Sequence, residues 1–185
     1  MCRIMTSNYK NCLTENGISI SGDRGKRAGF TGPALPELAP KYEFWKVWHN
    51  TLGKIPKEAS DRYYVREYYK QVLKGLDPAT VLKKIPEGSI LLCYEKADEF
   101  CHRHLVAYWF ELFLGISTSE VIENPKRETV RKVNRPEYLK SMLEDVIKEE
   151  YDMNDFTIIK MLYEKQRARR KALSLTRTDN NVNID

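Results

Sequence analysis

The sequence predicts an α/β fold with a small, mainly parallel sheet flanked by helices, and three observations support this. Residues 90–93 (Ile-Leu-Leu-Cys) form an unbroken apolar run, which is typical of a parallel strand buried on both faces. Residues 98–114 are apolar nearly all round and end before Gly115, which indicates a central helix. Residues 119–122 then return as a strand, so this part of the chain is a strand-helix-strand crossover unit.

The first elements of the chain are two short β-compatible runs, at residues 2–6 and 18–21. A loop rich in Gly, Pro and basic residues follows over 22–40. Long loops inside compact domains are usually functional or mobile, so we expect this loop to matter for function.

Three helices are expected between this loop and the central strand. Aromatic residues at 3.6-residue spacing predict a helix over 41–52. A second helix is expected from an N-cap at Ser60 to about residue 74. Asp77 and Pro78 open a third, short helix, because Asp caps a helix and Pro suits its first turn.

Beyond residue 123 the pattern becomes helical. From residue 134 onward the apolar residues follow i, i+3, i+4, i+7, i+8 at Leu139, Met142, Leu143, Val146 and Ile147. We therefore expect an α/β domain over 1–123, a helical extension over 124–172 and a disordered basic and polar tail over 173–185. The apolar stripe needs a cover, so the extension is a candidate interface, with the oligomeric state left open.

The net charge of +5 on the 185 residues is unevenly spread. Residues 160–178 carry seven basic residues and one acid, whereas residues 1–159 carry 24 basic and 23 acidic ones. A nearly neutral body limits contact with nucleic acid to that basic segment or to a local patch.

The sequence indicates a cytoplasmic protein without a cofactor or a metal. No apolar run approaches the roughly 20 residues of a membrane span, and no signal peptide follows Met1. The four cysteines show no regular spacing, which favours reduced thiols. Phosphate-binding and dinucleotide-binding glycine motifs are absent. Cys101 and His104 are three residues apart, but the only third metal ligand would be Cys93, whose side chain we expect in the core.

The stretch from residue 91 to residue 104 carries the candidate chemistry. Ligands of a parallel sheet bind outside the carboxyl ends of its strands, where the loop after 90–93 places Tyr94 and Glu95. With Asp98 as N-cap, Cys101, His102 and Arg103 fall in the first turns of the helix, a natural anion site.

Each of these residues has an expected role and a structural alternative. Arg103 would hold a phosphate or carboxylate, Glu95 or His102 would move a proton, and Cys101 would be a nucleophile or close contact. Further candidates for the rim of the site are Thr6, Ser7, Tyr9, Arg24 and Lys26. Alternatively, Cys101 is inert packing, Glu95 is an ion pair, and His102 and Arg103 tie the helix to the loop. His104 reads as a surface histidine.

Two motifs, Leu-Leu-Cys-Tyr-Glu-Lys at 91–96 and Phe-Cys-His-Arg-His-Leu-Val-Ala-Tyr-Trp at 100–109, closely resemble the signature of the bacterial and archaeal domain of unknown function 488 (DUF 488). Ile-Ser-Ile-Ser at 18–21 and Leu-Asp-Pro at 76–78 also look like that family. The resemblance covers about residues 1–123 and implies a Rossmann-like domain. It matches Glu95, Cys101, His102 and Arg103 but brings no reaction with it.

Two hypotheses of different classes follow, and whether the protein is an enzyme is left open. The first is a protein that binds a phosphate- or carboxylate-bearing ligand related to a nucleotide or a nucleic-acid base, with hydrolase or transferase chemistry. The second is a non-enzymatic, nucleic-acid-associated binding module that uses the basic residues of 160–178 and aromatic residues such as Tyr63 and Tyr64.

Overall fold

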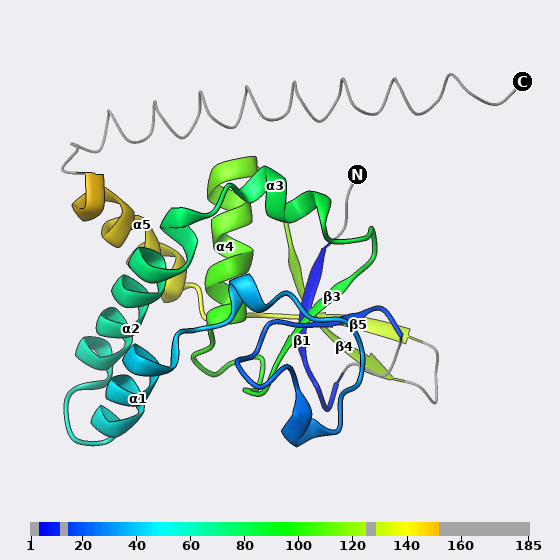
Figure 1. The fold of residues 1–185 in the computed structure, drawn as a ribbon, viewed down its shortest axis with the longest axis horizontal. Coiled ribbons are helices and arrows are strands. Elements are labelled where there is room, and N and C mark those ends of the chain that lie inside the picture. Colours follow the sequence, from blue (N-terminus) through cyan, green and yellow to red (C-terminus); the bar gives the residue numbers. More distant parts are fainter. Residues whose placement is uncertain (1–3, 12–14, 125–128, 152–185) are drawn as a thin grey trace, which may run out of the picture.

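The computed structural model describes residues 4–11, 15–124 and 129–151. Its strands are β1 (Met5–Asn8), β2 (Gly17–Ser19), β3 (Ile90–Cys93), β4 (Ser119–Asn124) and β5 (Thr129–Val133). They form one sheet in the order β2-β3-β1-β4-β5. All pairings are parallel except that of β4 with β5, so the predicted α/β class with a mainly parallel sheet flanked by helices is confirmed (Figure 1).

The helices are α1 (Tyr42–Thr51), α2 (Lys57–Gln71), α3 (Pro78–Lys83), α4 (His102–Leu114) and α5 (Tyr138–Tyr151). Figure 1 shows α4 next to the sheet, with α1, α2 and α5 grouped on its other side. Almost every side chain of α4 is buried, as expected for a central helix, and Gly115 ends it in the left-handed conformation. None of the helices described has the length and apolarity needed to cross a membrane.

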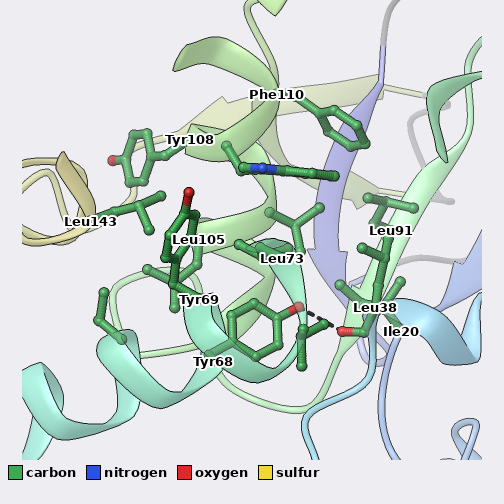
Figure 2. Packing of buried hydrophobic residues seen from close by; sticks show 14 of the residues in the cluster. Ile20, Leu38, Tyr68, Tyr69, Leu73, Leu91, Leu105, Tyr108, Phe110 and Leu143 are labelled. Carbon is green, nitrogen blue, oxygen red and sulfur yellow. Dashed lines mark hydrogen bonds between the residues drawn. The ribbon is translucent and has the colours of Figure 1, made fainter. Parts of the chain in front are cut away.

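Alternating residues of β3 face opposite sides of the sheet. Leu91 packs into the main core with residues from the helices, whereas Ile90 and Leu92 lie with Val121 in a smaller cluster on the other face. Figure 2 shows the main core, where the hydroxyl of Tyr68 in α2 donates a 2.6 Å hydrogen bond to the carbonyl of Leu38. That bond ties the end of the 22–40 loop to the helical layer.

The strand register brings two strand ends level with each other. Asn8 of β1 pairs with Cys93 of β3, so both strands end at the same height in the sheet. The residues that follow, Tyr9 and Tyr94, have ring centroids only 4.8 Å apart. The carboxyl edge of the sheet thus gathers side chains from segments that are 85 residues apart in the chain.

The expected helical extension over 124–172 begins instead with a strand, β5. Four of its five residues are exposed, so no apolar alternation marks it in the sequence. The predicted apolar stripe does form a helix, α5, but Leu139, Leu143, Val146 and Ile147 are buried in the main core against α2 and α4. The chain itself therefore covers this stripe. The rest of the extension and the expected tail lie outside the described residues.

Two helix starts differ from the prediction. Ser60 is not an N-cap: α2 begins at Lys57, and the Ser60 hydroxyl is hydrogen-bonded to that of Thr51 at 3.0 Å. Asp98 does not cap α4 either, because residues 96–99 close into a separate turn and Cys101 takes the N-cap position. The cap predicted at Asp77 is confirmed, since its carboxylate accepts the N–H of Thr80 at 2.9 Å.

Candidate functional site

A pocket of about 610 Å³ opens at the carboxyl end of β3. Four parts of the chain provide most of its lining: the loop at 21–27, the aromatic face of α1, Tyr64 of α2, and the segment from Cys93 to the start of α4. Its floor consists of Cys93, Glu95, Cys101 and His102, which we call the floor cluster. The position agrees with the rule that ligands of parallel sheets bind beyond the strand ends.

The four side chains of the floor cluster converge on one point. Glu95 Oε2 is hydrogen-bonded to both sulfurs, at 2.9 Å from Sγ of Cys101 and 3.2 Å from Sγ of Cys93. His102 Nδ1 lies 3.9 Å and 3.7 Å from the same two sulfurs. On the other side of the ring, Nε2–H donates to the carbonyl of Ile20 at 2.9 Å and fixes the ring in place.

These contacts give the two thiols different character. Burial alone raises the pKa of Cys101, but a hydrogen bond with Cys93 and the charges of Arg103 and His102 outweigh it and hold this pKa well below its usual value. Burial and the neighbouring Cys101 raise the pKa of Cys93. Burial lowers the pKa of His102, but the sulfur of Cys101 and the carboxylate of Glu95 raise it above its usual value. Burial and Cys101 raise the pKa of Glu95 to about 7. The pKa values of the two thiols are therefore shifted in opposite directions, that of Cys101 downward and that of Cys93 upward.

The sequence places these groups through simple local geometry. Cys93 lies two residues after Leu91 and so faces the helical side of the sheet, at the point where α4 begins. Its side chain therefore lines the pocket and does not simply fill the core as expected. Cys101 occupies the N-cap position of α4, although its sulfur makes no capping hydrogen bond to the first turn.

An aromatic wall rises from the floor cluster. Trp48, Tyr64 and Phe100 contact one another with ring centroids 5.0 to 5.3 Å apart, and Trp45 extends the wall along α1. The Nε1–H of Trp48 is buried and has no hydrogen-bond partner in the described part of the chain. The wall is suited to a flat, apolar group.

The opposite rim of the pocket is charged and comes from the 22–40 loop. The hydroxyl of Tyr94 donates to Asp23 Oδ2 at 2.6 Å, and the guanidinium of Arg27 lies 5.0 Å from the centroid of the Tyr94 ring. Burial would raise the pKa of Asp23, but this bond and those from Arg27, Gly25 and Ser21 hold it at about 2. Exposed Lys26 and Arg27 complete a rim with surplus positive charge.

Gly25 lets the rim loop close over the sheet. Its φ is +79°, and an added Cβ would lie 2.8 Å from atoms of both Phe30 and Tyr9. Its N–H donates to the Ser21 hydroxyl at 3.0 Å and to Asp23 Oδ1 at 3.0 Å. Glycine is therefore required at position 25 for the loop to pack this closely, and its N–H helps to hold Asp23 at the rim of the pocket.

Arg103 does not reach the pocket, although the sequence indicates an anion-binding role. Its side chain is fully buried, its Nε and Nη2 donate to the carboxylate of Glu120 at 3.0 to 3.3 Å, and Nη2 also donates to the carbonyl of Lys96 at 2.8 Å. Successive helix residues point about 100° apart, so Arg103 turns away from the side that His102 faces. Arg103 therefore has the structural role given above as the alternative: it ties α4 to the loop that carries Glu95.

Four of the five rim candidates also lie elsewhere. Thr6 is buried and donates to Glu120 Oε2 at 2.5 Å, and Ser7 donates to the carbonyl of Val121 at 2.6 Å. Tyr9 supports the rim from behind, with its hydroxyl bonded to those of Ser19 and Ser21. Arg24 is exposed outside the pocket, so Lys26 alone lines it.

Two further expectations concern histidine and tyrosine. His104 is completely buried and not at the surface. Burial and the charge of Arg103 lower its pKa to about 3, so it is neutral. Tyr64 is buried in the core, and Tyr63 is half-buried and packs against the same core. The basic segment 160–178 lies outside the described residues.

Sequence reasoning missed Asp23, Trp45, Trp48, Phe100 and Glu120. The aromatic spacing in 41–52 did mark one face of a helix, but not that this face borders a pocket. No local pattern pairs Glu120 with Arg103, which precedes it by 17 residues.

One comparison with known proteins found a match. The family model described as the active DUF488-N3 subclade (DUF488-N3a) matches residues 12–112, which include the whole floor cluster. No curated protein and no solved structure matches the chain. With more than half of its length matched and the two sequence motifs present, the chain belongs to the DUF488 family, within the active N3 subclade.

Proposed function

We propose that the protein is an enzyme that binds a planar heterocyclic ligand bearing a phosphate or carboxylate, of the nucleotide class. The floor cluster would carry out hydrolytic or group-transfer chemistry on it. The observation that carries the proposal is the convergence of two thiols, a carboxyl and an imidazole at the bottom of an aromatic pocket with a basic rim.

The shape and lining of the pocket support a flat ring as ligand. A pocket of about 610 Å³ is within the range for small-molecule sites and exceeds what a bare anion needs. Trp45 and Trp48 provide stacking area on one side, and stacking on aromatic side chains is worth roughly 1–3 kcal/mol per base.

The anion-binding groups of this proposal are Lys26 and Arg27. Arg103 is closed off by Glu120, whereas Lys26 and Arg27 are exposed at the mouth of the pocket. A ligand with its ring against the aromatic wall would present a phosphate or carboxylate to this rim. The guanidinium of Arg27 is suited to bidentate contact with either group.

The floor cluster provides the reactive groups. Cys101 is the nucleophile or close contact, and Glu95 is within hydrogen-bond reach of it and able to carry a proton to or from the ligand. His102, whose ring is held by the Ile20 carbonyl, lies beside the sulfur of Cys101 and would position it. Arg103 is a positioning residue, because its bond to the Lys96 carbonyl fixes the loop beside Glu95.

Binding is tested by titrating the full chain with a panel of nucleoside monophosphates and the matching nucleosides. Quenching of tryptophan fluorescence reports binding, since Trp45 and Trp48 line the pocket while Trp109 is buried in the core. We expect saturable quenching and a nucleotide Kd about tenfold lower than that of the nucleoside, the value of one charge-assisted contact of about 1.4 kcal/mol.

A matched pair of variants locates the anion. Lys26→Ala/Arg27→Ala should weaken nucleotide binding about tenfold and leave nucleoside binding unchanged. Lys10→Ala/Lys54→Ala removes the same charge from exposed residues outside the pocket and should change neither. Absence of binding at millimolar concentration, or an equal loss in both variants, would contradict the proposal. Conversion of a bound ligand, followed by mass spectrometry, should stop in Glu95→Gln while binding persists.

A further inference from the structure

Three groups of the floor cluster have the chemistry of a metal site. The Sγ atoms of Cys93 and Cys101 and a ring nitrogen of His102 all lie within 4.8 Å of one another. Two thiolates and an imidazole are ligands that zinc and other borderline-soft divalent metals prefer. Neither a Cys-x-x-Cys pair nor His104 contributes, so spacing in the sequence does not reveal the group.

The separations of the ligand atoms agree with tetrahedral coordination. With Zn–S near 2.3 Å and Zn–N near 2.0 to 2.1 Å, a sulfur and a nitrogen on one tetrahedral ion are about 3.5 Å apart. His102 Nδ1 lies 3.7 Å from the sulfur of Cys93 and 3.9 Å from that of Cys101. Both distances exceed that separation by less than half an ångström.

A second, independent observation concerns the far side of the imidazole. A histidine that binds a metal donates its other N–H to a carbonyl or carboxylate, which fixes its tautomer and orientation. His102 Nε2–H donates to the Ile20 carbonyl at 2.9 Å, which leaves Nδ1 as the nitrogen that faces the sulfurs. The outer hydrogen bond of a metal ligand is therefore already in place.

We propose that Cys93, Cys101 and His102 bind one Zn²⁺ ion, with the fourth position open to the pocket. Three protein ligands and one free position are the arrangement of catalytic zinc sites. A water there would lie near Glu95, whose Oε2 is 2.9 and 3.2 Å from the two sulfurs. On binding, each thiol releases its proton to solvent and becomes a thiolate ligand.

This inference deepens the proposed function, because it rests on the same floor cluster and names the attacking group. With zinc bound, both cysteines are ligands, and a metal-activated water replaces Cys101 as the nucleophile. The rest of the proposed function is unchanged, since the ring and the anion of the ligand would contact the aromatic wall and Lys26 and Arg27.

The test uses the full chain with Cys2→Ser and Cys12→Ser, so that Cys93 and Cys101 are its remaining thiols. The metal-free protein is titrated with Co²⁺, which gives a sulfur-to-cobalt charge-transfer band only when thiolates coordinate it. We expect the band to saturate at one equivalent and to disappear when one equivalent of Zn²⁺ is added. The same one-to-one Zn²⁺ stoichiometry should appear in elemental analysis of the loaded protein.

Variants identify the ligands. Cys93→Ser, Cys101→Ser and His102→Gln should each weaken Zn²⁺ binding at least tenfold in competition with a chelator, because each removes a ligand. His49→Gln changes an exposed histidine outside the pocket and should leave it unchanged. If a variant fails to fold, the metal site is tested in the parent protein by protection of its thiols. One equivalent of Zn²⁺ should slow alkylation of both cysteines by iodoacetamide at least tenfold.

Absence of both the charge-transfer band and the protection would overturn the metal site, as would a band that survives in all three ligand variants. The nucleotide titration, run with and without Zn²⁺, separates this failure from that of the proposed function. Binding of nucleotide by a protein that never binds metal defeats the metal site alone. Binding of metal by a protein that never binds nucleotide defeats the proposed ligand alone.

Discussion

Two polar clusters meet at the start of α4, and neighbouring residues of one short segment build both. Cys101 and His102 join Cys93 and Glu95 at the floor of the pocket. The next residue, Arg103, belongs to a closed cluster in which Glu120 accepts hydrogen bonds from it and from Thr6. Most side chains of both clusters are buried. The first cluster differs in lining this pocket, whereas Arg103 is held in an ion pair with Glu120.

The two clusters therefore have different roles, although residues of one motif contribute to both. In the closed cluster each charge has an opposite partner, and the ion pair joins the loop, α4 and β4. In the floor cluster the side chains are hydrogen-bonded to one another, and within the described residues their one hydrogen-bond partner outside the cluster is the Ile20 carbonyl. A residue of the closed cluster should therefore govern stability, and one of the floor cluster should govern reactivity.

The largest expected effect is on the closed cluster. Arg103→Leu leaves the Glu120 carboxylate buried without its partner, which should reduce the free energy of unfolding by about 3–5 kcal/mol in urea denaturation. Arg103→Leu/Glu120→Leu removes both charges and should recover most of that loss. If Arg103→Leu lowers the free energy of unfolding by less than about 1 kcal/mol, the ion pair does not stabilise the fold in the way proposed.

The next effect concerns the rim loop beside the floor cluster. In Gly25→Ala the new Cβ would lie 2.8 Å from atoms of Phe30 and Tyr9, on a backbone with positive φ. We expect this variant to lower the free energy of unfolding by about 3 kcal/mol. Gly29→Ala is the matched control, because its φ is +71° but nothing lies within 4 Å, and it should cost about 1 kcal/mol. Thermal denaturation of both variants measures the difference. Equal losses would mean that the rim does not depend on close packing at Gly25.

A smaller effect on stability is expected from the floor cluster itself. Cys101→Ala removes one sulfur atom and no fixed ion pair, so it should lower the free energy of unfolding by only about 1 kcal/mol. The same urea denaturation curves compare it directly with Arg103→Leu. A loss as large as that of Arg103→Leu would place Cys101 among the structural residues.

The smallest effect is electrostatic and lies at the rim. Tyr94→Phe removes the hydroxyl that donates to Asp23, so the Asp23 pKa should rise from about 2 toward its ordinary value of 3.8. Because the folded-state pKa is depressed, the interaction stabilises the fold fully above about pH 4, and this stabilisation is lost as the pH falls toward 2. An NMR titration of the Asp23 carboxyl carbon checks this, and an unchanged pKa would show that the bonds from Arg27, Gly25 and Ser21 set it without Tyr94.

Much of the fold follows from the sequence, because it depends on local patterns. The apolar run at 90–93, the cap at Asp77 and the apolar stripe of α5 each report their own element. The exposed edge strand β5 carries no such pattern and was wrongly assigned to a helical segment. The start of α4 was misplaced because Asp98, a good N-cap residue, lies in a turn that ends before the helix.

The candidate site was predicted in part, for a similar reason. The sequence places Glu95, Cys101 and His102 near the end of β3, and the structure brings them together there. Which way each side chain points depends on tertiary contacts, so Arg103 could not be assigned without knowledge of Glu120. The aromatic wall joins α1, α2 and the segment before α4, and only the packing of these elements shows it.

The central claim, that the floor cluster is an accessible reactive site and not part of the closed core, is tested most directly by alkylation of Cys101. Chelator-treated protein with Cys2→Ser and Cys12→Ser is exposed to iodoacetamide under native conditions, and the modified peptides are followed by mass spectrometry. We predict that Cys101 is alkylated in the folded protein, ahead of Cys93, and that a bound nucleotide slows the reaction. Modification of Cys101 only at the rate of global unfolding would contradict the account.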